Sequence, residues 1–454
     1  MNELVTAGLP ARLEQLVRGP ESPGQRFLCG SSNRDTVYAM AGQLRRELAD
    51  ESAPVCLASD DKTVLAAALL AALCGTPPLL LPPALSGNAL ARTRELTGFT
   101  VLITDKTDET TIPPDCRIVR PDPVGEATLP HPCPPPDPEA ELLRIFTGGS
   151  TGTPQIWSKS VANIFGEGLF LTDFFGIRPD DAIVATVPPY HIYGLLFSVI
   201  LPLVSGAGIV PETPVFAGNI EESVRSHHAT VLVAVPPHYR VLRNTVMPPA
   251  LRLAISSAGM LDKEDSLAFA AKNRTGVVEV YGSTETGGIA TRNRSRGEEA
   301  FTPFPPVEWH EHLGRLAVRS PFLSADLSRT DSGFFLTADK IEIRDRGFVL
   351  KGRSDHVTKV GGRRVDLDEI REQVKKIPGV TDALVLAVPE AGGRENLIAA
   401  LVETAEHNSG ELRNRLAGQL EPHAVPRILK TVDRLPVREN GKYDRQAAAR
   451  LLRP

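Results

Sequence analysis

Apolar and polar positions along the first part of the chain follow two periods. Residues 36–48 carry apolar side chains at helical spacing, and residues 64–74 are all apolar, which predicts an amphipathic helix and then a buried helix at 62–73. Short apolar runs predict strands at residues 55–58, 78–81, 101–104, 117–120 and 142–146. Strands that alternate with helices in this way predict an α/β fold.

The same alternation continues through the middle of the chain and then changes. Further helices are predicted at residues 161–175 and 195–204, and further strands at 182–186, 231–235 and 277–281. From residue 313 to 349, short β-runs separated by Gly and Asp predict a small antiparallel unit.

The last hundred residues predict a separate small α/β domain. They contain a charged helix at residues 366–376, strands at 383–388 and 397–403, and then helices. We therefore expect a large N-terminal domain over residues 1–353, with a small β-subdomain, and a small mobile C-terminal domain over residues 354–454.

Composition indicates an ordinary globular protein. The chain has 454 residues, 42% of them hydrophobic, and a net charge of −5, with no basic tail, so we expect no nucleic-acid partner. Its longest apolar run has 11 residues, whereas a membrane-spanning helix needs about 20, and no secretory signal is visible. Five cysteines without CxxC spacing fit a reducing cytoplasm rather than a disulfide framework. We expect a cytoplasmic monomer or homodimer.

A segment rich in glycine and hydroxyl groups follows the strand predicted at residues 142–146. It reads FTGGSTGTP over residues 146–154. Glycine lets the backbone turn its N–H groups inward, and hydroxyls add donors for phosphate oxygens. Since α/β proteins bind ligands at strand ends, we expect a phosphate site here, although not the GxxxxGKS or GxxxxGKT loop of common NTPases. Taken alone, the segment also fits a polar surface turn.

A second loop of similar composition, YGSTETGG, covers residues 281–288. It carries one carboxylate, Glu285, and Mg²⁺ is bound by one or two carboxylates together with phosphate oxygens and water. Tyr281 offers a ring face on which a base could stack. The alternative is a glycine-rich turn with one solvated acid.

Together the two loops resemble the acyl-adenylate-forming superfamily, which includes acyl-CoA and aryl-CoA ligases and the adenylation domains of nonribosomal peptide synthesis. Four further segments are similar to motifs of this superfamily: PYHIYG at residues 189–194, GFFLTAD at 333–339, GRSDHVTKVGGRRV at 352–365 and LPVRENGKYDR at 435–445. Taken alone, each segment also fits an ordinary surface turn or loop, but six such segments in family order are not expected by coincidence.

The resemblance implies the residues of the nucleotide and catalytic site. Lys442 would contact both the substrate carboxylate and the α-phosphate, Glu285 would bind Mg²⁺, and Thr284 and His191 complete the catalytic set. The expected nucleotide contacts are Thr147, Gly149, Ser150, Thr151, Gly152, Tyr281, Gly282, Ser283, Asp339, Arg353 and Arg364. Among these, Asp339 and Arg353 would hold the ribose.

The resemblance also implies an acid pocket and a path for a thiol. The expected pocket residues are His191, Tyr193, Val235, Pro236, Ser257, Ala258, Gly259, Gly282, Gly287 and Gly288. Residues 256–259 are more similar to aryl-CoA ligases than to fatty-acid ones, and residues 191–198 lack the Asp with which amino-acid-activating domains hold an amino group. We therefore expect an aryl or short acyl acid. Asp355 is the expected hinge, and Gly361 and Gly362 would line the thiol tunnel.

The implied function is an ATP-dependent carboxylic acid–thiol ligase that forms an acyl-AMP intermediate and then a thioester. ATP, Mg²⁺ and coenzyme A are the expected cofactors. Two alternatives stay open: a stand-alone enzyme that loads the phosphopantetheine of a carrier protein, and a non-catalytic nucleotide-binding relative. The chain departs from the family pattern at Gly148, where serine is usual, and at Gln155, where lysine is usual. Lys159 is a candidate to supply the missing charge.

Overall fold

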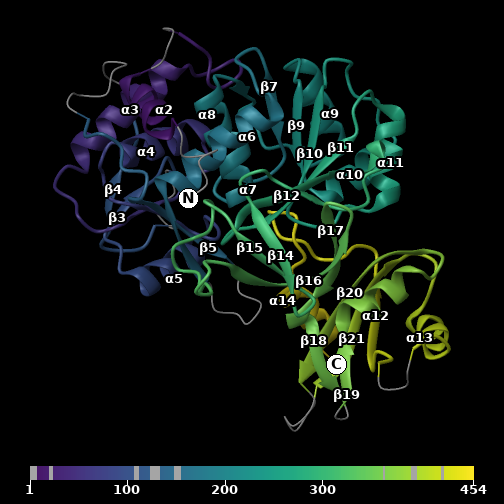
Figure 1. Ribbon diagram of the computed structural model, residues 1–454. Helices are drawn as coiled ribbons and strands as arrows, with labels where there is room; N and C mark the ends of the chain where they lie inside the picture. The colour runs from purple at the N-terminus through teal and green to yellow at the C-terminus, as the bar shows by residue number, and fades with distance from the viewer. Residues whose placement is uncertain are drawn as a thin grey trace. The chain divides into compact units, whose positions relative to one another are not determined.

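The structure is a computed structural model that describes residues 8–19, 24–106, 112–122, 133–147, 155–360, 363–389, 396–420 and 424–453. Contacts divide the chain into two compact units: residues up to 308 with residues 319–333, and residues 309–318 with residue 334 onward. Both units combine helices and sheets, which confirms the α/β class (Figure 1). The predicted boundary after residue 353, and the mobility expected of the C-terminal domain, stay predictions.

The first unit contains a six-stranded sheet in the order β4-β3-β1-β2-β5-β6, in which only β5 and β6 pair antiparallel. Its strands are β1 (Val55–Leu57), β2 (Leu79–Leu81), β3 (Val101–Ile103), β4 (Arg117–Val119), β5 (Glu141–Thr147) and β6 (Gln155–Ser160). The accompanying helices are α2 (Leu9–Arg18), α3 (Arg34–Glu47), α4 (Lys62–Leu73) and α5 (Gly87–Thr97). Helix α4 has the predicted limits, because Asp61 caps its first turn by accepting from the amides of Thr63 and Val64.

A second sheet of seven strands has the order β13-β12-β11-β10-β9-β7-β8. The strands from β11 to β8 run parallel, whereas β12 and β13 are antiparallel to their neighbours. The strands are β7 (Ala182–Ala185), β8 (Gly208–Ile209), β9 (Val231–Ala234), β10 (Leu253–Ser256), β11 (Val277–Ser283), β12 (Gly287–Asn293) and β13 (Thr302–Pro303). Helices α9 (Ala217–Ser226), α10 (Pro236–Leu242) and α11 (Lys263–Lys272) lie along this sheet and share a buried core with it (Figure 1).

Two of the predicted helices in the first unit contain a π-helical turn. The segment predicted at 161–175 consists of η2 (Ala162–Gly166) and α6 (Glu167–Phe175), and the segment predicted at 195–204 consists of α7 (Ile192–Leu195), η3 (Leu196–Ile200) and α8 (Leu201–Ser205). A short 3₁₀ turn, η4 (Arg294–Arg296), follows β12.

The second unit contains a four-stranded sheet of β14 (Glu308–His312), β15 (Arg315–Arg319), β16 (Phe335–Arg344) and β17 (Gly347–Arg353). Strands β15 to β17 form the antiparallel unit that the sequence predicted, whereas β14 lies outside the predicted range. The 3₁₀ turn η5 (Ser354–His356) leads to the hairpin of β18 (Val357–Val360) and β19 (Arg363–Asp366).

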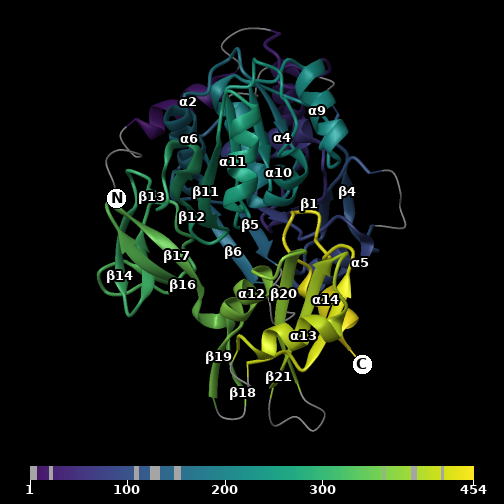
Figure 2. The ribbon, with the colours of Figure 1, turned by 90° about the vertical axis from the view of Figure 1, so that its right-hand side faces the viewer.

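A three-stranded sheet organises the rest of the second unit (Figure 2). It comprises β20 (Val380–Pro389), β21 (Asn396–Thr404) and β22 (Ile428–Val432), with helices α12 (Leu367–Lys375), α13 (Ser409–Ala417) and α14 (Arg445–Leu452). Successive strand residues face opposite sides: Ala383 and Val385 pack with α12 and α13, whereas Leu384 and Leu386 pack with α14. The sheet is therefore buried on both faces.

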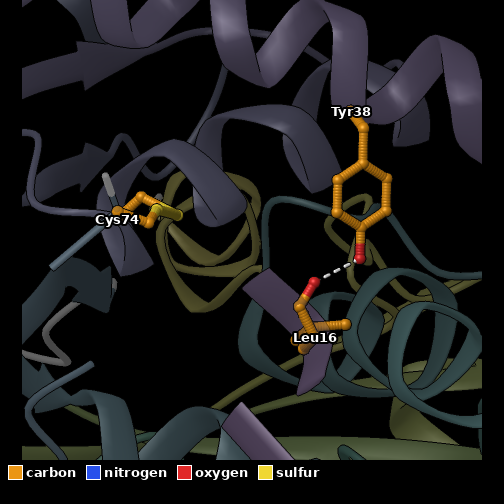
Figure 3. Close-up of a disulfide and its surroundings, with 4 residues drawn as sticks. Leu16, Tyr38 and Cys74 are labelled. Atoms are coloured by element: carbon orange, nitrogen blue, oxygen red, sulfur yellow. Dashed lines mark hydrogen bonds between the residues drawn. A yellow bond between two sulfur atoms is a disulfide. The ribbon is translucent and has the colours of Figure 1, made fainter. Parts of the chain in front are cut away.

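The structure contains a disulfide between Cys74 and Cys133, so the expectation of no disulfide framework is wrong for this pair. Cys74 ends α4, and the fold brings the Cα atoms of the two residues, 59 positions apart in sequence, to 5.4 Å. Figure 3 shows the disulfide and, nearby, the Tyr38 hydroxyl donating to the carbonyl of Leu16 at 2.5 Å. Within the described ranges, no helix is long and apolar enough to cross a membrane.

Candidate functional site

The second glycine-rich loop is the tip of an antiparallel hairpin between β11 and β12. The strand before it was predicted, but β12 begins at Gly287, inside the segment interpreted as loop. The register shifts between Tyr281 and Gly282. A Cβ atom on Gly282 would lie 2.3 Å from the carbonyl oxygen of Gly287, so only glycine fits there.

The hydroxyl groups of this tip have two different environments. The Ser283 and Thr286 hydroxyls bond to each other at 2.8 Å, and the Ser283 amide donates to the Thr286 hydroxyl at 3.0 Å, so these two side chains shape the turn. Thr284 is buried, and Glu285 is half-buried. The tip therefore places Thr284 and Glu285 at the carboxyl end of β11, where ligands of α/β sheets bind.

Two charged side chains lie buried beneath this tip. Lys159, from β6, donates its Nζ to the carbonyl of Phe322 at 3.0 Å and to that of Glu285 at 3.4 Å. Glu167, the first residue of α6, accepts from the amide of Gly288 at 2.7 Å. Burial raises the pKa of Glu167 and lowers the pKa of Lys159. Lys159 thus binds backbone carbonyls, which does not support its suggested role as a substitute for the lysine missing from the first loop.

The first glycine-rich loop lies largely outside the described residues. The predicted contacts Gly149, Ser150, Thr151 and Gly152 all fall in that gap, and Thr147 is described only by its backbone, as the last residue of β5. Thr147 pairs with Gln155, the first residue of β6. The loop therefore connects two neighbouring antiparallel strands.

The predicted acid-pocket residues gather at the carboxyl ends of β9, β10 and β11. Tyr193 is buried and donates its hydroxyl to the carbonyls of Ala234 at 3.1 Å and Ile255 at 3.2 Å, while burial raises its pKa well above the ordinary value. The Ser257 hydroxyl donates to the carbonyl of Val280 at 2.8 Å. These two hydroxyls thus hold neighbouring strands together.

The other pocket candidates lie in the connections that follow these strands. Val235 and Pro236 begin α10, His191 precedes α7, and Ala258, with φ +68°, lies next to Gly259. Gly287 and Gly288 direct their side-chain positions into the interior, because a Cβ would meet Glu167 and Phe322 at 2.6 Å in the first case and Phe304 at 2.9 Å in the second. Any contact of these two glycines with an acid would thus come from their backbone.

The sequence reasoning did not single out His238, which lies among these residues. In α10, its Nδ1 atom is 2.7 Å from the hydroxyl of Thr186, directly after β7. Its position two residues after Pro236 is the sequence signal that could have identified it.

The predicted ribose residues are neighbours in the second unit. Asp339 on β16 and Arg353 on β17 are register partners, and Arg353 Nη1 donates to Asp339 Oδ1 at 3.4 Å. The Asp339 amide donates to the Thr337 hydroxyl at 3.2 Å. The structure thus brings together the two residues expected to hold a sugar.

The predicted hinge, Asp355, is the middle residue of η5, and only its backbone is described. The next residue, His356, has its Nδ1 3.0 Å from both carboxylate oxygens of Asp368, and Arg445 Nη2 lies 3.1 Å from its Nε2. The Arg353 amide also donates to Asp368, at 3.0 Å. Arg364 lies on β19 and is described only by its backbone, and Gly361 and Gly362 lie outside the described residues.

Lys442 is exposed on a tight turn that begins at Arg438. The Arg438 amide donates to the Lys442 carbonyl at 2.8 Å, and Gly441 adopts φ +75°, which favours glycine. Tyr443 anchors the end of this turn, because its hydroxyl donates to the carboxylate of Asp382 and accepts from Arg371 Nη2 at 3.1 Å.

Comparison with known proteins assigns this chain to a family. The family model described as AMP-binding enzyme matches residues 33–310, and the model described as AMP-binding enzyme C-terminal domain matches residues 369–442. The chain therefore belongs to the AMP-binding enzyme family, within the acyl-adenylate-forming superfamily. The predicted enzyme class, an AMP-forming acid–thiol ligase, is confirmed.

Particular relatives include the sulfoacetate–CoA ligase of Cupriavidus necator, 28% identical over 69% of this chain and 68% of the relative. The 4-coumarate–CoA ligase of Rhodobacter capsulatus is 30% identical over 65% of this chain and 73% of its own length. The chain spans about two thirds of the length of the curated relatives it matches, and 64% of one malonate–CoA ligase. ATP-bound MatB from Rhodopseudomonas palustris has the same fold, with a TM-score of 0.82 at 21% identity over 99% of both chains.

Proposed function

We propose that this protein activates a carboxylic acid with ATP and transfers the acyl group to coenzyme A. The observation that carries the proposal is the β11–β12 hairpin, whose tip holds Thr284 and Glu285 beside the strand ends where the acid-pocket candidates gather. Two relatives are named sulfoacetate–CoA ligase and 4-coumarate–CoA ligase, and the CoA in both names supports CoA as the thiol.

In the first half-reaction, an oxygen of the substrate carboxylate forms a bond to the α-phosphorus of ATP, and the bond to pyrophosphate breaks. Two anions must approach each other, so catalysis depends on positioned positive charge and donors. Lys442 would offset the charge of the carboxylate and the α-phosphate, and Thr284 would donate to phosphate oxygens. Asp339 and Arg353 would hold the ribose, and Tyr281 would pack against the adenine.

The residues at the hairpin tip fit a magnesium ion that is bound mostly by ATP. Among the described residues, no cluster of three or more His, Cys, Asp or Glu side chains could hold a metal by itself. Mg²⁺ prefers such an arrangement, with one or two carboxylates plus phosphate oxygens and water. Glu285 would hold the ion, which when bound neutralises phosphate charge.

In the second half-reaction, the thiol sulfur attacks the acyl carbonyl and AMP leaves. We propose that the small domain turns at Asp355 between the two half-reactions and that Gly361 and Gly362 then line the path of the pantetheine. Hinges of this kind gate many enzymatic cycles. Lys442 would act in the first half-reaction and be dispensable in the second.

The hydroxyl groups among the pocket candidates already donate to backbone carbonyls, which favours an acid with an apolar body. Both Tyr193 and Ser257 already donate to backbone carbonyls, so they present carbon surface rather than unpaired donors. Such pockets suit aryl or short acyl groups. We therefore propose an aryl or short acyl acid as the substrate.

The deciding experiment is carboxylate-dependent exchange of pyrophosphate into ATP over a panel of aryl and short acyl acids. Exchange with one acid, followed by thioester formation with CoA, is the expected result. Thioester formation only with a holo-carrier protein would favour the carrier-loading alternative, and no exchange with any acid would favour a non-catalytic relative.

A variant of Lys442 tests the division of labour between the two half-reactions. Lys442→Ala should abolish exchange and still convert preformed acyl adenylate into thioester. Lys376→Ala, which removes an exposed lysine bonded only to Gln373 among the described contacts, is the matched control and should retain both. Equal loss of both half-reactions in Lys442→Ala would contradict the assigned role.

A further inference from the structure

The buried pair beneath the β11–β12 tip has features that a core-filling role does not explain. Lys159 is 1% exposed and Glu167 is 2% exposed. Burying an ammonium and a carboxylate carries a large desolvation cost, which apolar side chains of similar size would avoid. A function for these two charges must therefore depend on what their polar atoms contact.

Lys159 fixes one peptide group of the tip. The carbonyl oxygen of Glu285 accepts from Lys159 Nζ at 3.4 Å and from the amide of Ser324 at 2.8 Å. The same Nζ reaches the Phe322 carbonyl at 3.0 Å, so one ammonium joins the tip to the segment that carries Phe322 and Ser324. With its carbonyl held inward, Glu285 has a defined backbone orientation from which its side chain extends.

Glu167 fixes the other side of the tip. Its Oε1 accepts from the Gly288 amide at 2.7 Å, and Gly287 leaves no room for a side chain between the hairpin and this carboxylate, since a Cβ would lie 2.6 Å from Oε2. The amide of Gly288, just after the tip, is thus held by a buried carboxylate.

The position of Lys159 also connects the two glycine-rich loops. It lies on β6, the strand that leaves the first loop at Gln155, and its side chain reaches the tip of the second loop 126 residues later in sequence. An interaction at this point couples the strand next to one loop with the backbone of the other.

We propose that Lys159 and Glu167 are positioning residues that hold the 284–288 backbone in the orientation that presents Thr284 and Glu285 to Mg²⁺ and ATP. This inference rests on the proposed function. Neither residue touches the reacting atoms, and both act through backbone groups of the tip. Lys159 thereby contributes to the proposed nucleotide site through the backbone of Glu285 rather than through a contact with the nucleotide.

Binding of ATP in the presence of Mg²⁺, measured by titration calorimetry without any acid, tests the proposal. Lys159→Met should weaken this binding about tenfold to a hundredfold, the effect of losing a hydrogen bond to a charged group. Lys159→Arg should recover most of the affinity. Unchanged binding in Lys159→Met would overturn the proposal.

Arg292→Met is the matched control. Arg292 forms a buried ion pair with Glu279 at 2.7 Å on the same hairpin, towards its other end. This variant should bind Mg²⁺ and ATP within about twofold of the wild type, because the hydrogen bonds of the Arg292 side chain go to Glu279 and the Glu299 carbonyl and not to the 284–288 segment. Equal weakening in Arg292→Met and Lys159→Met would reduce Lys159 to a general stabilising role.

The double variant Lys159→Met/Glu167→Met separates stability from positioning and replaces Lys159→Met if that variant does not fold. Removing both buried charges should preserve the resistance of the first unit to urea, because the desolvation cost of the two charges is removed together with their hydrogen bonds. Nucleotide binding should stay weak, and its recovery would overturn the proposal. Absence of exchange with every acid would refute the proposed function but leave this binding comparison intact.

Discussion

Tyr443→Phe tests whether the network beneath Lys442 supports the turn that presents this lysine. Asp382 is 1% exposed and accepts from Arg371 at 2.8 Å, from the Ala383 amide at 2.7 Å and from the Tyr443 hydroxyl. Burial alone would raise the pKa of Asp382, but the Arg371 guanidinium and the Tyr443 hydroxyl outweigh it and hold this pKa below the ordinary 3.8. The carboxylate is therefore ionised at neutral pH.

Loss of the Tyr443 hydroxyl removes the hydrogen bond that it donates to Asp382 and the one that it accepts from Arg371 Nη2. A hydrogen bond to a charged group contributes about 1.5–3 kcal/mol. Since Asp382 keeps its bonds to Arg371 and Ala383, we expect the low end, about 1.5 kcal/mol. The phenylalanine ring retains the packing of Tyr443 against the α14 side of the sheet. The loss should therefore act on the turn more than on the core.

Hydrogen exchange of the peptides over α12 and β20 measures the stability of this unit by itself, and the two half-reactions are assayed separately. We expect adenylation to fall about tenfold, the equivalent of about 1.4 kcal/mol, and thioester formation from preformed adenylate to stay within about twofold. Tyr38→Phe, which removes a hydroxyl bonded to Leu16 in the first unit, is the control and should affect neither half-reaction. Hydrogen-exchange protection of α12 and β20 equal to that of the wild type, or an equal loss of activity in both half-reactions, would refute the reasoning.

Three further predictions follow from buried groups, tight turns and the disulfide. Burial lowers the pKa of Lys62 from 10.5 to about 8, so between pH 8 and pH 10.5 the unfolded chain binds more protons than the folded one. Relative to Lys62→Met, the free energy of unfolding of the wild type should therefore rise with pH across that window by up to about 3 kcal/mol. A difference between the two proteins in urea unfolding that does not change with pH would contradict this. Gly282→Ala should disrupt the β11–β12 hairpin and abolish nucleotide binding, whereas Gly259→Ala, whose Cβ would lie 3.5 Å from its nearest neighbour, should fold normally and change only acid binding, as circular dichroism and calorimetry would show. Cys133→Ser should destabilise the first unit by about 2–4 kcal/mol, because it opens the long loop closed with Cys74; equal urea midpoints for variant and wild type under oxidising conditions would count against a stabilising disulfide.

The fold class and the identity of the main segments could be predicted from sequence because they depend on local patterns. Helix α4 has the predicted limits, since an apolar run and an aspartate cap determine it locally. The predicted antiparallel unit is confirmed as β15–β17, and β14 is an additional strand of the same sheet. The superfamily is confirmed as well, since its motifs are short and occur in a fixed order.

Features that depend on distant contacts were missed. Strand β12 begins in glycines that suggest a loop, and only pairing with β11 makes them a strand. Lys159 was a candidate to supply the charge missing from the first loop, yet it is buried and bonds to carbonyls more than a hundred residues away in sequence. The pairing of Cys74 with Cys133 likewise depends on the path of the connector before β5, which spacing does not show. The predicted site residues themselves remain predictions until the variants are measured.

The bonds around His356 restrict where a rotation of the small domain can take place. Because Nε2 accepts from Arg445, the imidazole proton lies on Nδ1 and is donated to Asp368, and Asp368 also accepts from the amide of Arg353. One carboxylate therefore fastens the chain on both sides of Ser354 and Asp355. A turn of the proposed hinge that keeps these bonds is restricted to the torsion angles between the Arg353 amide and the His356 ring, and a wider turn must first break the bond of Arg353 or of His356 to Asp368. The proposed hinge is thus spanned by one carboxylate, that of Asp368, which must release a partner before a wide rotation.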